Sequence, residues 1–402
     1  MINESSIEDY HGIVEDQKLE QLKEKASKFS DKHIVHINST FTGGGVAEIL
    51  TDLVTLTNNL GIETGWRILK GTPDFFQVTK KFHNALQGGE INLTDIKKDI
   101  YTEENKWNSK MNHLGEHDMV FIHDPQPLPF IEYNEEERNQ QWIWRCHIDL
   151  SEPNNIIWDY LKNFIEKYDG SIFTADKYKK KLGIPQHTIM PSINPISVKN
   201  KELGKSTISK YLHKYNIERD KPVITQISRF DKWKDQLGVI DIYNKINKEE
   251  DCKLILMGDM AFDDPEAPEY YQKVVKKAGE DEDIHIITQR NDLLVNIFQR
   301  VSDVVLQKSI REGFGLTLSE AMWKETPVIG TDIGGIPLQI KDGETGYLVN
   351  TKDECAEKIL KIIRDDELKK KLGENAKEHV RQNFLITRHA ENYLDLMEKY
   401  LE

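Results

Sequence analysis

Glu312 and Glu320 stand eight positions apart, with two glycines between them, in the segment SIREGFGLTLSEAMW. An apolar run over 304–307 precedes this segment and predicts a strand, and an apolar helical pattern begins at Leu316. A helix that starts after a glycine loop leaves backbone N–H groups unpaired and favours an anion. Carboxylates beside that loop can accept hydrogen bonds from hydroxyl groups. Together these features suit a ligand that carries both phosphate and sugar hydroxyls.

The same local pattern allows a plainer interpretation. In that interpretation Glu312 is an acid that caps the helix, and Glu320 is a solvated residue on its surface. Both roles are ordinary for glutamate, because a negative charge near a helix N-terminus interacts favourably with the helix dipole. The rest of the chain must decide between the two.

Length and composition indicate a chain of two ordinary domains. The sequence has 402 residues, 38% hydrophobic and 30% charged, with a formal net charge of −14. So large a negative charge argues against binding to nucleic acid or to an anionic membrane. The three cysteines form no CxxC pair, the N-terminal segment lacks the apolar core of a signal peptide, and no run approaches the ~18 apolar residues of a membrane span. We therefore expect a cytoplasmic protein.

Strands alternate with helical patterns along both halves of the chain, which predicts an α/β fold with two doubly wound parallel sheets. In the first half the predicted strands are 33–38, 66–69, 120–123, 143–148, 171–174 and 188–190. A polar stretch that reaches about residue 205 is expected to be a linker. The series then restarts with predicted strands at 222–227, 254–257, 284–287, 304–307, 327–330 and 346–349. Ligands of such sheets bind beyond the carboxyl ends of the strands.

Three segments of the second half resemble the GT-B retaining glycosyltransferases, in the large family that includes sucrose and glycogen synthases. They are SRFDKWK (228–234), REGFGLTLSE (311–320) and GGIPLQIKDGETGYLV (334–349), and they occur in the order that the family has. The resemblance implies a GT-B fold, with two Rossmann-like domains that face each other across a deep cleft. We expect an acceptor-side domain over 1–205, a nucleotide-sugar donor domain over 206–380, and a C-terminal helix over 381–402 that returns to the first domain.

Four segments of the first half narrow the resemblance to trehalose synthases of the glycosyltransferring type and to the related trehalose phosphorylases. They are HINSTFTGGGVAEIL (36–50), TKKFHNALQG (79–88), HDPQP (123–127) and WIWRCHIDLS (142–151). With these segments included, the resemblance extends over nearly the whole chain from about residue 33.

The resemblance implies roles for residues that match the family's motifs. Arg229 and Lys234 would clasp the donor diphosphate, Glu312 would lie beside the transferred sugar, and His147 would bind that sugar; we take these four as the catalytic group. Positions expected to bind the donor are Gly44, Gly45, Arg290, Gly313, Phe314, Gly315, Leu316 and Glu320. Within this set, Glu320 is expected to bind the ribose hydroxyls. The segment at 289–290 is expected to lie beside the nucleobase.

Polar groups at strand ends or in a loop of the first half are the candidates for binding the acceptor. They are His83, Asn84, Asp124, Gln126 and Asp149, with His83 and Asn84 expected at the start of a loop. Arg145 is expected to pair with Asp149 or Asp124, or to form a structural ion pair. No metal ligands are expected, and the acidic pair at 263–264 is interpreted as loop surface.

The implied reaction moves glucose from a nucleoside-diphosphate glucose (UDP-, ADP- or GDP-glucose) to glucose, giving trehalose with retention at the anomeric carbon. No cofactor is required, and Mg²⁺ is compatible with the reaction without being needed. The expected partners are the small-molecule nucleotide sugar and its sugar acceptor. Neither a nucleic acid nor a membrane is expected as a partner, and the resemblance also allows a homodimer.

Other functions are open at the level of sequence. A trehalose phosphorylase would use inorganic phosphate and glucose 1-phosphate in place of the nucleotide, and another nucleotide-sugar transferase would make a different compatible-solute glycoside. A sugar epimerase of the same fold would bind a nucleotide sugar and transfer nothing. A non-enzymatic two-lobed sugar-binding protein would leave Arg229, Lys234 and the two glutamates without a role.

Overall fold

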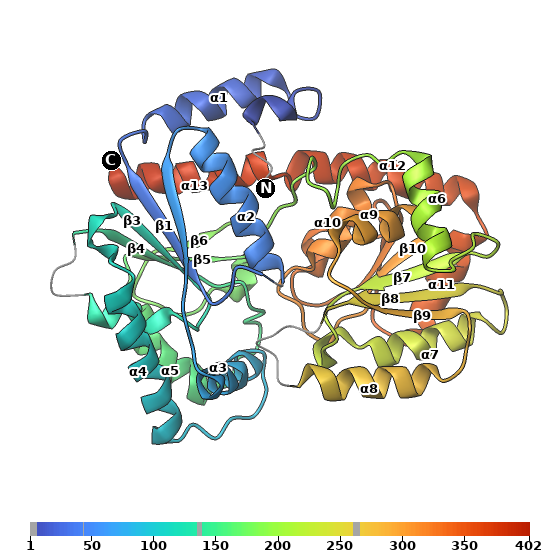
Figure 1. Ribbon diagram of the computed structural model, residues 1–402, viewed down its shortest axis with the longest axis horizontal. Coiled ribbons are helices and arrows are strands. Elements are labelled where there is room, and N and C mark those ends of the chain that lie inside the picture. Colours follow the sequence, from blue (N-terminus) through green and yellow to red (C-terminus); the bar gives the residue numbers. More distant parts are fainter. Residues whose placement is uncertain (1–5, 43, 135–138, 260–265) are drawn as a thin grey trace. The chain divides into compact units, whose positions relative to one another are not determined.

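The computed structural model describes residues 6–42, 44–134, 139–259 and 266–402 (Figure 1). The chain divides into two compact units. The first unit comprises residues 1–192 together with 386–402, and the second unit comprises residues 193–385. Each unit is an α/β structure with one parallel sheet of six strands.

The sheet of the first unit has the strand order β2-β1-β3-β4-β5-β6. Its strands are β1 (His33–Asn38), β2 (Glu63–Ile68), β3 (Met119–His123), β4 (Gln141–Arg145), β5 (Gly170–Phe173) and β6 (Gln186–Thr188). The helices are α1 (Asp16–Ser27), α2 (Gly45–Asn59), α3 (Pro73–Leu86), α4 (Asp95–Met111), α5 (Asn155–Ile165) and α13 (Ile386–Leu401). Every residue of β3 is buried, as expected for a parallel strand with both faces covered. Short 3₁₀ helices occur at Ile7–Tyr10, Leu114–Glu116, Leu128–Tyr133 and Asp176–Tyr178.

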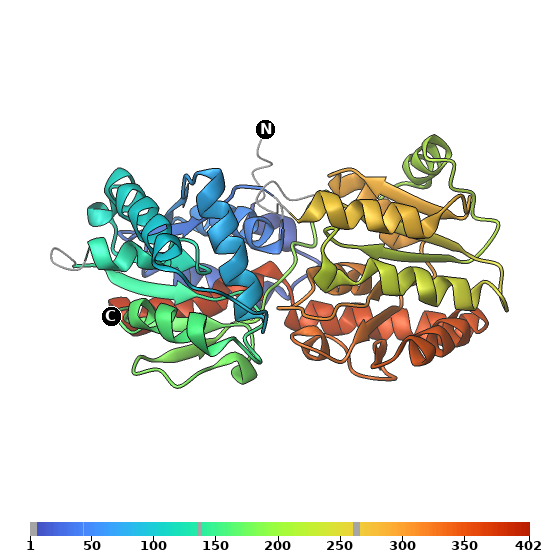
Figure 2. The same ribbon diagram turned by 90° about the horizontal axis from the view of Figure 1, so that it is seen from below.

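The sheet of the second unit has the order β12-β11-β10-β7-β8-β9. Its strands are β7 (Val223–Ile227), β8 (Lys253–Gly258), β9 (Ile284–Thr288), β10 (Val304–Gln307), β11 (Val328–Thr331) and β12 (Tyr347–Val349). The helices are α6 (Lys205–Lys214), α7 (Gln236–Ile246), α8 (Ala267–Ala278), α9 (Asp292–Val301), α10 (Leu316–Trp323), α11 (Lys352–Ile363) and α12 (Asp366–Asn383). Short 3₁₀ helices occur at η5 (Lys232–Lys234) and η6 (Ile336–Leu338). Figure 2 shows helices on both sides of this sheet.

Alternation along the strands of the second unit divides its core between the two faces of the sheet. Leu254 and Leu256 of β8 pack in one apolar cluster with α7 and α11, whereas Ile255 and Met257 pack in another with α6 and α9. Successive side chains of a strand point to opposite faces, so one short apolar run supplies both cores. This arrangement fixes the strands and leaves their carboxyl ends to carry the loops of the site.

Two local expectations of the sequence are wrong. The strand expected over 143–148 ends at Arg145, and His147 follows it in a loop. His83 and Asn84 lie in the last turns of α3, not at the start of a loop. Thr72 caps that helix by accepting from the N–H of Phe75. Its apolar face continues to Leu86, so the helix extends beyond the two polar residues.

Gly335 offers a test of how tightly the second unit packs around the Glu312 loop. Its N–H donates to the carbonyl of Glu312 at 3.0 Å, and a Cβ atom there would lie 2.2 Å from the oxygen of Gly313 and 2.7 Å from the Cα of Phe314. We expect Gly335→Ala to lower the free energy of unfolding by about 1–3 kcal/mol, because overpacking forces the loop to move. Urea denaturation measures this.

Gly204→Ala is the matched control, because a Cβ there would meet nothing closer than 4.0 Å. It should unfold close to the wild type. Equal stability of the two variants would mean that the loop yields without cost.

Candidate functional site

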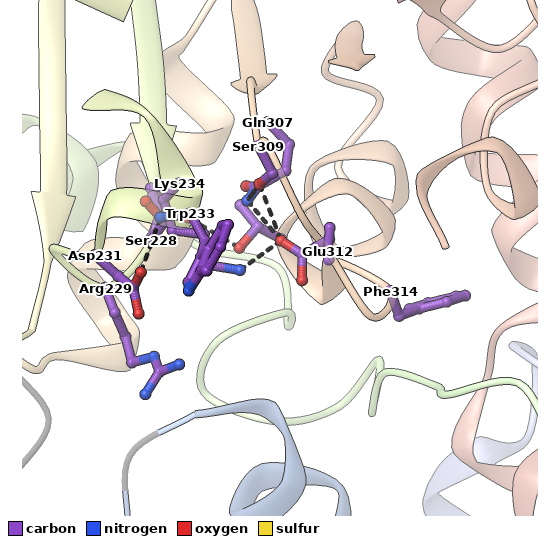
Figure 3. A network of polar contacts seen from close by, with 12 residues as sticks. Ser228, Arg229, Asp231, Trp233, Lys234, Gln307, Ser309, Glu312 and Phe314 are labelled. Carbon is purple, nitrogen blue, oxygen red and sulfur yellow. Dashed lines mark hydrogen bonds and ion pairs between the residues drawn. The ribbon is translucent and has the colours of Figure 1, made fainter. Parts of the chain in front are cut away.

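The Glu312 carboxylate lies at the centre of a hydrogen-bonded cluster beyond the carboxyl end of β10 (Figure 3). Its Oε2 atom accepts from Lys234 Nζ at 2.5 Å, Gln307 Nε2 at 3.0 Å and Ser309 Oγ at 3.1 Å. The side chain is 9% exposed. A carboxylate with this burial and these three donors is fixed in place, so Glu312 is not a solvated capping acid.

The loop after β7 holds Lys234 against Glu312. Asp231 caps η5 by accepting from the N–H of Trp233 at 2.8 Å. The N–H of Ile310 donates to the carbonyl of Trp233 at 2.7 Å, which ties the loop after β7 to the loop after β10. The ion pair therefore joins two loops that are already connected through their backbones.

Two buried glutamines hold the backbone of the loop after β7 by hydrogen bonds. Gln226 donates to the carbonyl of Lys234 at 2.8 Å, and Gln236 donates to the carbonyl of Arg229 at 2.7 Å. Each side chain belongs to a residue that is 1% exposed. Buried amides of this kind fix the backbone from which both cations project.

Arg229 differs from Lys234 in its surroundings. It is partly exposed, and no group in the described residues hydrogen-bonds or ion-pairs with its guanidinium (Figure 3). A guanidinium presents several donors in a fixed planar fork that matches phosphate. Arg229 is therefore a cation held by its backbone and available to an anion.

The start of α10 supplies a second group of donors near Glu312. Gly315 adopts a left-handed conformation with φ of 88° as the N-cap residue, which residues with a Cβ rarely adopt. The N–H groups of Leu316 and Thr317 begin the helix, and within the described chain they have no acceptor. Gln339, fully buried, accepts from the N–H of Ser319 at 3.1 Å. An anion at this position would find fixed backbone donors.

Glu320 is buried in α10 and not a solvated surface residue. The residue is 3% exposed, and its Oε2 atom accepts from Gln299 Nε2 at 2.9 Å. Its Oε1 atom lies 3.6 Å from Lys199 Nζ. Lys199 belongs to the segment expected to be a linker, whose neighbour Asn200 is 1% exposed. The cost of burying a charge is offset here by an amide and a cation.

The remaining donor-side candidates lie on separate elements. Gly44 has φ of 87° and precedes α2, which begins at Gly45 in the first unit. Gly313 lies in the Glu312 loop, and the ring of Phe314 packs against Phe384 with 5.7 Å between ring centroids, away from the cluster in Figure 3. Arg290 follows β9 and is exposed. Residues 263–264 and Gly43 lie outside the described residues.

Asp124 and His147 come together in the first unit, at the ends of the neighbouring strands β3 and β4. The backbone N–H of His147 donates to Asp124 Oδ1 at 2.8 Å. Burial raises the pKa of the Asp124 carboxyl to about 7, although this hydrogen bond and the charge of Arg145 act in the opposite direction. Asp124 also has φ of 62°, a conformation that aspartate tolerates better than most residues. A carboxyl of this kind can serve as donor or acceptor near neutral pH.

The other acceptor candidates are held in different ways. Asp149 is 1% exposed and accepts from the N–H of Ser151 at 2.9 Å. Gln126 accepts at its backbone carbonyl from Asn105 Nδ2 at 3.0 Å. His83 Nδ1 lies 3.1 Å from the Gln87 amide, in the same turn of the chain as Asn84.

Arg145 makes no ion pair with Asp124 or Asp149, contrary to the expectation from sequence. It is fully buried, and its guanidinium donates to the carbonyls of Phe173 (3.5 Å) and Ile189 (2.6 Å). The strand ends of β5 and β6 offer carbonyls closer than either carboxylate. Arg145 thus holds the edge of the sheet together.

Sequence reasoning missed several residues that complete these clusters. They are Gln307, Ser309, Gln299, Gln339, Lys199 and two histidines, His36 and His123. A polar residue that ends a buried apolar run, such as Gln307 after 304–306, is a usable signal, because such a residue needs a partner. Lys199 gave no signal, since it stands in a lysine-rich stretch.

Among the described residues, no group of three or more His, Cys, Asp or Glu side chains could hold a metal ion. In the same residues, every helix is too short or too polar to cross a membrane.

Two α/β units, each with one six-stranded parallel sheet, are the architecture of the GT-B glycosyltransferases. Solved structures of similar fold include a sucrose-phosphate synthase from Thermosynechococcus elongatus, with a TM-score of 0.72 and 17% identity over 92% of this chain and 99% of that one. A trehalose-6-phosphate synthase matches with a TM-score of 0.74 and 14% identity, over 92% of this chain and 99% of that one.

The model of the trehalose synthase N-terminal domain matches residues 36–180, and that of glycosyl transferases group 1 matches residues 208–379. Trehalose synthase of Thermococcus litoralis is 49% identical over 98% of this chain and 97% of its own length. Trehalose synthase of Rubrobacter xylanophilus is 42% identical over 98% of this chain and 97% of its own length. The chain belongs to the trehalose synthase family and is a hexosyltransferase.

Acid should destabilise the first unit through its buried histidines. Burial lowers the pKa of His36 to about 3, and it holds the pKa values of His123, His147 and His389 well below their ordinary range. The unfolded chain binds these protons near pH 6.5, so the free energy of unfolding falls as pH drops below that value. Asp124 acts with the opposite sign, because its raised pKa favours the folded state below pH 7.

The free energy of unfolding of the wild type should fall between pH 7 and pH 5. In His36→Phe this fall should be smaller by about 2 kcal/mol, because the titrating imidazole is gone. Urea denaturation of both proteins at the two pH values measures the difference. An unchanged pH dependence would contradict the interpretation of His36 as a buried, neutral imidazole.

Proposed function

We propose that the protein makes trehalose by moving glucose from a nucleoside-diphosphate glucose to free glucose, with retention at the anomeric carbon. The observation that carries the proposal is the cluster in which Lys234 and Glu312 join two loops, with Arg229 and the start of α10 beside it. Membership of the trehalose synthase family supports the choice of sugar and acceptor.

The departing nucleoside diphosphate gains negative charge as the bond between the anomeric carbon and its phosphate oxygen breaks, and the second unit has suitable donors for it. Arg229 offers a planar fork that no acceptor among the described residues engages, and Lys234 offers an ammonium held on its loop. The amides of Leu316 and Thr317 add partial positive charge at the helix start. Fixed donors aimed at developing charge are an effective form of catalysis, and they need no metal ion.

Glu320 supports a nucleotide as the carrier of that phosphate. A buried carboxylate on a helix that begins beside the phosphate loop can accept hydrogen bonds from the two ribose hydroxyls. Inorganic phosphate has no group that would need it.

Glu312 fits a binding and electrostatic role. Its Oε2 atom accepts from three groups, and an ion-paired carboxylate with these bonds is a weak nucleophile. We infer that retention proceeds by attack of the acceptor hydroxyl on the same face that the diphosphate leaves. The leaving phosphate oxygen would take the acceptor's proton, while His147 would hydrogen-bond to the transferred sugar.

Asp124, Gln126, Asp149, His83 and Asn84 remain the proposed acceptor ligands, and all five belong to the first unit. Asp124, with its raised pKa, could donate to or accept from a sugar hydroxyl. The proposed reaction requires no cofactor, and its small-molecule partners involve neither nucleic acid nor membrane. A cytoplasmic location and a homodimer are part of the same proposal.

A trehalose phosphorylase is the second candidate, because Arg229 and Lys234 would bind inorganic phosphate as readily as a diphosphate. The trehalose phosphorylase of Pleurotus pulmonarius is 29% identical over 90% of this chain and 55% of its own length. Its lower identity and partial match favour the synthase.

Product analysis tests the proposal. The purified protein is incubated without added metal with UDP-, ADP- or GDP-glucose, each with glucose, with 3-phosphoglycerate or with no acceptor. Trehalose together with the released nucleoside diphosphate is expected from glucose. Failure of every donor, with glucose 1-phosphate formed from trehalose and phosphate, would overturn the proposal in favour of the phosphorylase.

Lys234→Ala should lower kcat by about 10²–10³, the usual effect of removing one fixed donor to developing charge. The initial rate of nucleoside diphosphate release measures it. Lys221→Ala is the control, because Lys221 forms a partly buried ion pair with Asp283 at 2.7 Å, and both residues precede strands of the sheet, at the end opposite to the Glu312 cluster. Comparable losses in both variants would remove the specific role of Lys234.

Glu320→Gln should raise the Kd of the nucleoside diphosphate by about 10- to 100-fold, because hydrogen bonds to a charged group are worth more than neutral ones. Calorimetric titration measures this, and the affinity for inorganic phosphate should stay the same. Glu325→Gln, at an exposed ion pair with Lys377, serves as the control. Unchanged nucleotide affinity in Glu320→Gln would remove the ribose assignment.

A further inference from the structure

Three histidines of the first unit form a continuous hydrogen-bonded chain across its sheet. His36 lies in β1, His123 ends β3, and His147 follows β4, and these three strands are neighbours in the sheet. His36 Nδ1 lies 2.9 Å from His123 Nε2, and His123 Nδ1 lies 3.0 Å from His147 Nε2. The proposed function uses only the last of these rings.

The chain runs from the interior of the unit to its edge. His36 is 2% exposed and His123 is 1% exposed, whereas His147 is partly exposed. The ring of His36 stacks on Phe121 with 4.8 Å between centroids, and Tyr393 of α13 packs on both rings. The three imidazoles are therefore held by packing as well as by hydrogen bonds.

The surroundings keep all three rings neutral. Burial is the main cause of their lowered pKa values, and the charge of Arg145 adds to it for His123 and His147. His389 of α13 acts in the same direction on these two rings. The nearby carboxylate of Asp124 accepts from the backbone of His147 and not from its ring.

A neutral imidazole has one N–H donor and one bare nitrogen acceptor. In a chain of three such rings, the tautomer of one ring therefore determines the tautomers of the other two. Only two states keep both hydrogen bonds. In one state every ring carries its proton on Nδ1, and in the other every ring carries it on Nε2.

His36, at the buried end of the row of three histidines, determines which of these two states is favoured. The only hydrogen-bond partner of His36 among the described residues is His123, through Nδ1, and with the residue 2% exposed little water can reach Nε2. An N–H there would lack a protein acceptor, which costs more than a bare nitrogen without a donor. His389 in the same unit follows this rule, because its Nδ1 bonds to the carbonyl of Met190 and its Nε2 has no partner. Protons on Nδ1 are therefore favoured along the chain.

We propose that His36 and His123 are positioning residues that fix His147 in the Nδ1–H tautomer, so that its ring presents a hydrogen-bond donor at the end of β4. The use of that donor on the transferred sugar rests on the proposed function, whereas the tautomer does not. A ring free to change tautomer would be an acceptor for part of the time and would bind the sugar less well.

The tautomer is measured on the ligand-free protein by ¹⁵N nuclear magnetic resonance of the histidine rings, with His147 assigned from its loss in His147→Gln. We expect His147 Nδ1 to be protonated and Nε2 bare in the wild type. In His123→Phe, which keeps a ring but removes both hydrogen bonds, the two nitrogens should shift toward a mixture of tautomers. Identical His147 signals in the two proteins, or a protonated Nε2 in the wild type, would overturn the proposal.

Kinetics give an independent readout. His123→Phe should lower kcat by about tenfold, the effect of one weakened hydrogen bond in the transition state, with the KM for the nucleotide sugar nearly unchanged. His123→Gln should recover much of that loss, because an amide can accept from one neighbour and donate to the other. Phe121→Leu, which alters packing on His36 and leaves the chain of hydrogen bonds, should retain kcat.

Equal losses of kcat in His123→Phe and Phe121→Leu would assign the effect to packing and overturn the positioning role. Absence of trehalose formation by the wild type would instead refute the proposed function, and the resonance experiment would still decide the tautomer. Thermal denaturation confirms that each variant is folded before it is compared.

Discussion

One carboxylate oxygen organises the second unit's site. Glu312 Oε2 receives Lys234 from the loop after β7, and Gln307 and Ser309 from the end of β10. The ion pair is stabilising only because other contacts hold both loops in place. These contacts are the hydrogen bonds of Gln226 and Gln236 and the backbone hydrogen bond from Ile310 to Trp233. A buried pair repays the cost of its desolvation when its geometry is fixed and its remaining hydrogen bonds are made. The sheet, whose strands bring both loops to one edge, supplies that geometry.

The strand ends of the first unit carry groups that are neutral near pH 7, unlike those of the second unit. They include His147 and a carboxyl, Asp124, whose pKa lies near neutrality, where the second unit carries ionised pairs. Sugar hydroxyls both donate and accept, so neutral donors and acceptors suit them, whereas phosphate requires positive charge. The neutral and the ionised groups thus lie on separate sheets of the same architecture, as the proposed function requires.

The parts of the site that depend on local sequence could be predicted. The strand at 304–307, the glycine loop and the helix from Leu316 follow directly from apolar spacing, and motif resemblance placed Arg229 and Lys234 beside them. The partners of these groups could not be predicted, because they come from other strands. His36 and His123 are 87 positions apart, and nothing in either segment indicates that β1 pairs with β3. The error at His83 and Asn84 has a local cause, since two adjacent polar residues suggest a loop, whereas the apolar face of α3 continues past them to Leu86.

The path of the chain has a consequence for biosynthesis. Helix α13 (Ile386–Leu401) packs with α1 and α2 in the first unit, although the whole second unit precedes it in the chain. Its Tyr393 covers the rings of His36 and Phe121, and its His389 bonds to the carbonyl of Met190. The first unit can therefore complete its fold only after the whole second unit has been synthesised. Until α13 is made, the parts of α1 and α2 that it packs against stay exposed, and a chaperone could bind them.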